Sequence, residues 1–273
     1  MHFCLQGMTL IALLCLNASA WAGQPVFNEM PRWDDGWGFQ LVPEYRSRQG
    51  LISGSETIDD DVSEHFGILH IDGVYTWDRR IRVTAKLPVV LIGAKNTTDA
   101  AGKQYQQSDT FMGDATIGVP LKHYYNLDGR SGSWTVAPQF RIPLGPTHDY
   151  SVFPRVWGAG LTAGVETETY RYHGALGFGG WYFSDDKPAK FQASLSTGFN
   201  VHAFGSSGHA KVKASVELED DGSILVQVSS IFYWRFSDLV HGQMTWTMDA
   251  YNWQATPTIG NTQSATAGVG FVY

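Results

Sequence analysis

Apolar and polar residues alternate with a period of two along most of the chain after residue 35. Within residues 81–92, for example, the charged side chains fall only at even positions and apolar side chains fill the odd ones. Such alternation predicts β-strands that have one apolar face. Twelve segments show it: 37–46, 69–77, 81–92, 111–123, 133–143, 156–166, 170–183, 191–203, 209–219, 224–236, 243–253 and 264–273. The pattern predicts an all-β, antiparallel fold of about 12 strands without helices between them.

The last of these segments ends on an aromatic residue at the chain terminus. Terminal residues of a soluble domain are usually frayed and solvated, so an apolar strand is unusual there. The spacing resembles the C-terminal signal that bacterial outer-membrane β-barrels present to the barrel assembly machinery, and it is carried by Thr266, Gly268, Phe271 and Tyr273. A soluble sandwich would show the same alternation. The terminal pattern and the scarcity of charge on the apolar faces favour a transmembrane β-barrel, closed by pairing of this strand with residues 37–46.

The N-terminal residues predict export. Residues 9–16 form an apolar run that is too short to span a bilayer as a helix, and two overlapping small-x-small cleavage sites follow it at residues 18–22. We therefore expect a cleaved signal peptide over residues 1–22, although its first eight residues carry no Lys or Arg. A periplasmic segment or plug over residues 23–35 and the barrel over residues 36–273 would follow. Both cysteines lie in the expected signal peptide, which leaves no disulfide in the mature chain.

Composition narrows the class of protein. The formal net charge of −7 argues against a nucleic-acid partner, because such a partner calls for a basic surface. Aromatic residues make up 14% of the chain and there are 30 glycines, which suits a barrel with aromatic girdles and close internal packing. No apolar run after residue 22 approaches the length of a membrane-spanning helix. The expected surroundings are outer-membrane lipid and lipopolysaccharide.

The connections predict the orientation. Long polar stretches at residues 47–64, 93–110 and 145–155 alternate with short links, and barrels of this type place long loops outside and short turns in the periplasm. Later connections alternate less clearly, so counts of ten or fourteen strands stay open. Acidic clusters at residues 59–64, 185–186 and 220–221 fall in outer connections, where solvated charge and binding of a divalent cation are both open. Their spacing is not that of a dedicated calcium loop, and no metal or cofactor is predicted.

The polar faces of the strands supply the candidate site. In a barrel, the face opposite the apolar one points into the lumen. The charged and histidine side chains expected there are Glu44, Arg46, His70, Asp72, Arg82, Lys86, Asp114, Arg141, Glu166, His173 and Lys213. They could pair across a narrow lumen and hold its shape, or line a permeation path for uncharged or amphipathic solutes. Residues 158–163 satisfy the dinucleotide pattern Gly-x-Gly-x-x-Gly/Ala, but they lie within a strand. Close packing on the lumen face explains Gly158, Gly160 and Gly164.

One segment also resembles a known family. Residues 111–118, with the pair Gly113-Asp114, look like the Gly-Asp-x-x-x-Gly strand of the outer-membrane family named for the MetA pathway of phenol degradation, whose usual pattern has one further glycine. Residues 136–145 resemble the next strand and loop of that family. The resemblance implies a channel or transporter that takes up small hydrophobic or aromatic molecules across the outer membrane. Inward-facing Trp181 and Phe183 could then contact the solute or serve in packing.

An enzyme and a purely structural or adhesive barrel remain as alternatives. Outer-membrane lipases and lipid A deacylases are similar barrels with a His and a Ser two residues apart on a lipid-facing strand, where the His acts as the base for the Ser nucleophile. No histidine here has Ser or Thr two residues later. The His- and Ser-containing stretch 202–209 has the composition of a turn. The sequence therefore predicts no catalytic residues.

Overall fold

The computed structural model describes residues 35–98, 104–127, 130–145, 151–185, 187–203 and 206–273. The expected signal peptide and the segment 23–35, apart from Asp35, lie outside these ranges. Among the described residues no helix is long and apolar enough to cross a membrane. The strands are β1 (Gly36–Gly54), β2 (Glu56–Asp78), β3 (Ile81–Thr98), β4 (Gln104–Ser108), β5 (Ala115–Gly118), β6 (Leu121–Leu127), β7 (Arg130–Ile142), β8 (Gly158–Glu168), β9 (Tyr172–Phe183), β10 (Lys190–Ala203), β11 (Ser206–Glu219), β12 (Ile224–Arg235), β13 (Val240–Ile259) and β14 (Gln263–Val272).

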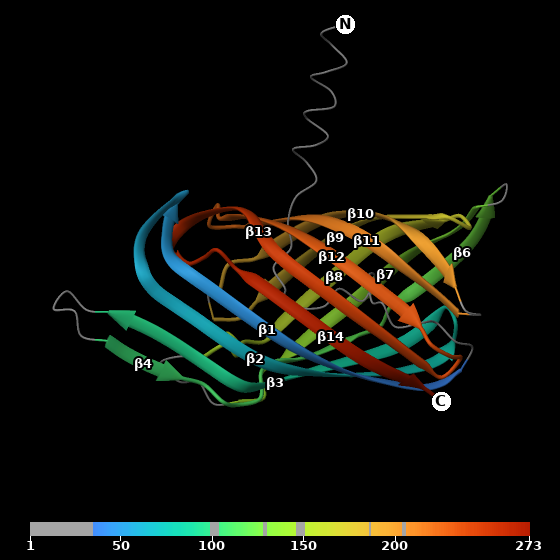
Figure 1. Ribbon diagram of the computed structural model, residues 1–273, viewed down its shortest axis with the longest axis horizontal. Coiled ribbons are helices and arrows are strands. Elements are labelled where there is room, and N and C mark those ends of the chain that lie inside the picture. The colour runs from blue at the N-terminus through green and yellow to red at the C-terminus, as the bar shows by residue number, and fades with distance from the viewer. Residues whose placement is uncertain (1–34, 99–103, 128–129, 146–150, 186, 204–205) are drawn as a thin grey trace, which may run out of the picture.

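These strands form one closed antiparallel barrel (Figure 1). Neighbouring strands pair in sequence order, and β14 returns to pair with β1 over the register from Gly38↔Val272 to Ser47↔Gln263. The predicted closure of the last strand onto the first is therefore confirmed. Because side chains alternate between the two faces of a strand, this register keeps every apolar face on the same side of the wall.

The fourteen strands make twelve strands of the barrel wall. β5 and β6 each pair with both β3 and β7, so together they are a single wall strand. They are separated at Pro120, which has no N–H to donate to the ladder. β4 pairs only with β3 and extends that strand beyond the wall. The twelve predicted segments match the twelve wall strands, so the predicted fold class is confirmed.

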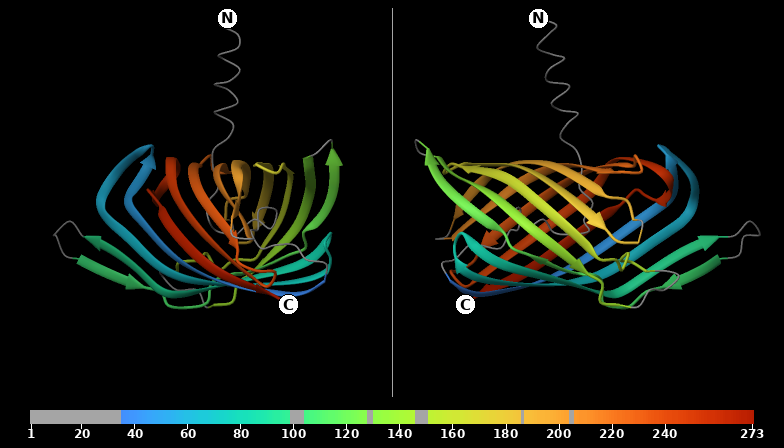
Figure 2. Two further views of the ribbon diagram at one scale, coloured as in Figure 1. Left: turned by 45° about the vertical axis from the view of Figure 1, so that its right-hand side comes forward. Right: turned by 180° about the vertical axis from the view of Figure 1, so that it is seen from behind.

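The connections differ from their prediction at the end of the barrel opposite Tyr273, here called the far end. Residues 47–64 are not a loop, because β1 and β2 continue as a paired hairpin up to Gly54 and Glu56. Residues 94–98 and 104–108 are likewise paired, as the end of β3 and β4 (Figure 2). The alternating pattern runs on past the apolar part of each strand. The end of β1 also pairs with β13, at Leu51↔Ile259, so the hairpin of β1 and β2 extends the wall, whereas β4 pairs only with β3 and projects from it.

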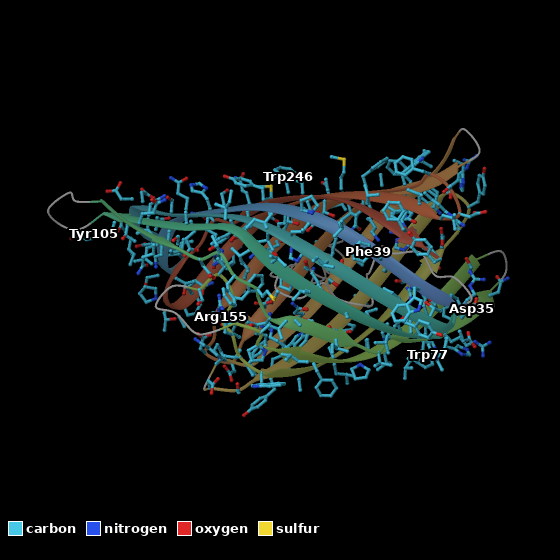
Figure 3. All side chains as sticks on the ribbon, turned by 90° about the horizontal axis from the view of Figure 1, so that it is seen from below. Asp35, Phe39, Trp77, Tyr105, Arg155 and Trp246 are labelled. Atoms are coloured by element: carbon cyan, nitrogen blue, oxygen red, sulfur yellow. The ribbon has the colours of Figure 1, made fainter. Side chains whose placement is uncertain are left out.

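The two faces of the wall are chemically distinct. Large apolar side chains such as Phe39, Leu161 and Trp246 are 38%, 54% and 51% exposed on the outer face (Figure 3 labels two of them). The opposite positions of the same strands carry buried polar side chains, for example Gln40 and Thr162 at 1% exposure. This arrangement is the reverse of a soluble domain and suits a wall with lipid outside and a polar lumen inside.

Candidate functional site: the barrel lumen

The structure places the eleven candidate residues on the inner, lumen-facing side of the barrel wall. Six are buried: Glu44, Arg46, His70, Arg82, Asp114 and Arg141. The others are half-buried: Asp72, Lys86, Glu166, His173 and Lys213. They are spread along the whole lumen and do not form a single site.

The tightest group of charges joins β1 and β2. Glu44 lies 2.8 Å from the guanidinium of Arg46 and 2.5 Å from Nε2 of His70, and all three side chains are almost fully buried. A carboxylate in a low-dielectric interior needs such partners, because an unpaired buried charge is very costly. This group ties two neighbouring wall strands together, which fits the shape-holding role.

Other candidates make separate contacts. Glu166 pairs with Lys122 and accepts a hydrogen bond from Ser133 at 3.2 Å. The ring of His173 stacks on that of His209 at 5.9 Å, close to the end of the barrel where the C-terminus lies. These contacts cross between strands at different heights, so each stabilises its own level of the lumen.

Residues 151–156, here called the inward segment, belong to the connection between β7 and β8 at the far end and fold into the barrel, which the sequence did not predict. Val152 and Phe153 are 3% and 2% exposed, and they share a buried apolar cluster with wall side chains of β2 and β3, namely Phe66, Ile68 and Val90. Burying an apolar side chain of this size is worth about 1.5–3 kcal/mol relative to exposure. That gain explains why the segment folds against the inner wall instead of standing in water.

An ion pair fixes this inward segment. Nη2 of Arg155 donates to both carboxylate oxygens of Asp109, at 3.0 and 3.1 Å, and the Val152 N–H donates to the same carboxylate at 2.9 Å. The Arg155 N–H donates to Asp114 at 3.1 Å. Figure 3 places Arg155 within the outline of the barrel. Two aspartates that follow β4 therefore bind the backbone and the guanidinium of the segment that follows β7.

The Gly113-Asp114 pair has a structural role in this contact. A Cβ at Gly113 would lie 2.4 Å from the ring of Phe153, so only glycine leaves room for that ring. Asp114 lies 3.6 Å from Arg141 and also receives the Arg155 N–H. The Gly113-Asp114 pair therefore packs against residues 151–156 and accepts a hydrogen bond from them.

The inward segment forms one wall of a cavity in the far half of the lumen. The cavity has a volume of about 390 Å³, within the range of small-molecule sites. Its lining combines aromatic, charged and amide side chains, among them Arg46, Arg48, Arg141, Val156, Trp181, Phe183, Lys187, Lys190, Gln192, Glu217, Glu219 and Gln227. Of the eleven sequence candidates, only Arg46 and Arg141 contribute to it.

The aromatic part of the lining is a pair of rings on β9. Trp181 and Phe183 have centroids 5.9 Å apart and planes only 2° from parallel, and they share a buried cluster with Val156. A Cβ at Gly160 would come within 2.6 Å of the Trp181 ring, and one at Gly158 within 2.9 Å of the Phe183 ring. Both rings therefore lie close against the backbone of β8, and the prediction that close packing explains these glycines agrees with this geometry.

The sequence did not reveal most of this cavity. The inward segment and its ion partner Asp109 were missed, and so were the lining residues Lys190 and Glu217. The available signal was the apolar pair Val152-Phe153 next to Arg155 inside a connection, since a solvated loop has no use for two large apolar side chains.

The histidines of residues 202–209 and the carboxylate of Asp221 make separate local contacts in the described part of the chain. His202 stacks on Tyr170 at 4.5 Å, whereas His209 stacks on Tyr233 at 5.0 Å, so the histidines of residues 202–209 have different neighbours. Within the described ranges, no group of three or more His, Cys, Asp or Glu side chains is arranged to hold a metal ion. Asp221 instead accepts a hydrogen bond from the N–H of Ser223, as is common in turns.

Known structures share this fold. No protein-family model and no curated protein matches the chain. The chain is similar to the COG4313 outer membrane channel from Pseudomonas putida F1, with a TM-score of 0.67, 13% identity and coverage of 94% of this chain and 100% of the other. Weaker matches are the CymD monoaromatic hydrocarbon channel (TM-score 0.43, 9% identity, 88% and 89% covered) and the KdgM porin in complex with oligogalacturonate (0.40, 7%, 86% and 99%). The first of these likenesses shows that the chain has the fold of an outer-membrane β-barrel.

Proposed function

We propose that this protein is an outer-membrane channel for small hydrophobic or aromatic solutes, exported by its signal peptide and inserted by the barrel assembly machinery. The observation that carries the proposal is the cavity of about 390 Å³ inside the barrel, with the Trp181–Phe183 pair in its lining. A structural barrel would be expected to fill this volume with side chains, as small barrels do.

Several further features support the same function. The outer face carries the apolar side chains that a lipid environment requires, and the fold is that of an outer-membrane β-barrel. The Gly113-Asp114 segment, which resembles the family named for the MetA pathway, packs against the part of the chain that borders the cavity. Membership of that family is part of the proposal.

Solute entry into intact cells tests this function. A lipopolysaccharide leaflet resists hydrophobic solutes, so Gram-negative cells that make the protein should take up radiolabelled naphthalene faster than cells without it. The matched control is the chain lacking residues 271–273, which we expect not to assemble. Equal rates of entry in cells with the full-length protein and with the control would contradict the proposal.

A further inference from the structure

The charges around the cavity are unevenly distributed. Five cationic side chains but only two carboxylates line it, although acidic residues outnumber basic ones in the whole chain by 26 to 19. Both carboxylates, Glu217 and Glu219, are bound by Lys190 at 2.8 and 2.5 Å. The remaining cations of the lining are Arg46, Arg48, Arg141 and Lys187. The side chains that border the cavity directly are therefore mostly cationic.

Each of the three arginines pairs with a carboxylate that does not itself border the cavity. Glu44 lies 2.8 Å from Arg46, Glu64 lies 3.6 Å from Arg48, and Asp114 lies 3.6 Å from Arg141. The guanidinium groups are thus held in place from the wall side while they border the cavity. A guanidinium carries five N–H donors in a fixed plane, which suits a second carboxylate in the lumen.

The cationic and aromatic parts of the lining adjoin each other. Arg141 on β7 and Phe183 on β9 are both register partners of Gly158 on β8, which has no side chain to separate them. The guanidinium carbon of Arg141 lies 5.3 Å from the centroid of the Phe183 ring. One row further along, Trp181 is the register partner of Lys190 on β10. The aromatic pair therefore has a cation on each side.

We propose that this cavity binds an aromatic carboxylate, with its ring against the Trp181–Phe183 pair and its carboxylate toward Arg141 and the arginines of β1. The inference rests on the proposed function and narrows its solute class. A neutral aromatic molecule would use the rings but would not accept charge-assisted hydrogen bonds from the lining cations. An aliphatic carboxylate would use the cations but gain no stacking energy from the rings.

Calorimetric titration of the protein refolded in detergent tests the inference without requiring conduction. The three probes are benzoate, benzyl alcohol, which lacks the charge, and cyclohexanecarboxylate, which lacks the aromatic ring. At low ionic strength, we expect benzoate to bind with a dissociation constant about tenfold lower than that of benzyl alcohol, because hydrogen bonds from a guanidinium to a carboxylate are stronger than those to a neutral hydroxyl. We expect it to be about threefold lower than that of cyclohexanecarboxylate.

Variants locate the site. Arg141→Gln and Arg48→Gln should each weaken benzoate binding and leave benzyl alcohol unaffected, and Trp181→Leu should weaken both aromatic probes. Arg235→Gln is the matched control, because Arg235 pairs with exposed Asp238 in the turn after β12. Two arginine variants keep the test decisive should one fail to fold, which the gel shift of unboiled protein would reveal.

The outcomes separate this inference from the channel function. Equal affinity for benzoate and benzyl alcohol, or for benzoate and cyclohexanecarboxylate, would overturn the inference and leave the channel proposal standing. Benzoate binding that Arg141→Gln and Arg48→Gln leave unchanged would also overturn it. Selective benzoate binding by a protein that lets neither naphthalene nor benzoate enter cells would contradict the channel function but not the site.

Discussion

Arg155 and Asp109 form an ion pair inside the barrel, in which Nη2 of the arginine lies 3.0 and 3.1 Å from the two carboxylate oxygens. Their side chains are 1% and 2% exposed. The two residues are far apart in the sequence and come from two different connections at the far end. Their pairing keeps residues 151–156 against the inner wall, and so sets one boundary of the cavity.

Removing one partner of this pair should be strongly destabilising. Arg155→Gln leaves the Asp109 carboxylate buried without its cation, which typically costs about 3–5 kcal/mol. The double variant Arg155→Gln/Asp109→Asn removes both charges and should recover most of the loss. Urea unfolding followed by the gel shift measures both values. A double variant as unstable as the single one would show that the charge pair does not fix the segment.

The glycine beneath Trp181 should not tolerate even one added methyl group. In Gly160→Ala, the new Cβ would lie 2.6 Å from the ring, so the ring or the strand must move, and overpacking of this kind costs about 1–3 kcal/mol. Gly73→Ala is the matched control, because its Cβ would meet nothing within 4 Å. The unfolding midpoints of the two variants should differ clearly. Equal midpoints would mean that the ring does not rest on Gly160.

A charge near the middle of the outer face should be costly only in a membrane protein. Leu161→Arg on β8 places a cation where lipid is expected, at a cost of about 2–4 kcal/mol. Leu239→Arg makes the same change in the turn between β12 and β13, where we expect a cost of about 0–1 kcal/mol. Unfolding in lipid vesicles gives both values. Similar costs at the two positions would argue against a lipid-facing wall.

The C-terminal residues should be needed for assembly. Phe271 is the register partner of Phe39, and the N–H of Tyr273 donates to the carbonyl of Trp37 at 2.8 Å, so these residues close the barrel. Deleting residues 271–273 should abolish the heat-modifiable, folded form in outer-membrane fractions. Tyr273→Phe keeps the terminal aromatic ring and should assemble normally. A deletion variant that still folds in the membrane would refute the predicted assembly signal of Thr266, Gly268, Phe271 and Tyr273.

The wall strands could be predicted from the sequence because the signal is local. Each strand shows its own two-residue period. The position of Arg46 or Arg141 in that alternation is enough to place its side chain on the polar face of the strand. The same alternation continues past the apolar part of β1 and β2, so the sequence did not separate a polar hairpin from a loop.

The cavity could not be predicted because it depends on contacts between distant parts of the chain. Nothing near Val152 in the sequence indicates that β2 and β3 offer an apolar patch to cover. Likewise, the two-residue alternation places Trp181 and Arg141 on the inner face but does not give their heights along the barrel axis. Only the register through Gly158 brings Arg141 to Phe183.

Conductance of the purified protein in planar lipid bilayers tests the channel function most directly. The wild-type barrel should open discrete single-channel steps, and Arg155→Gln, which loosens the inward segment, should give larger or noisier steps than the Arg235→Gln control. A folded barrel, verified by its gel shift, that inserts into the bilayer but never conducts would contradict the account.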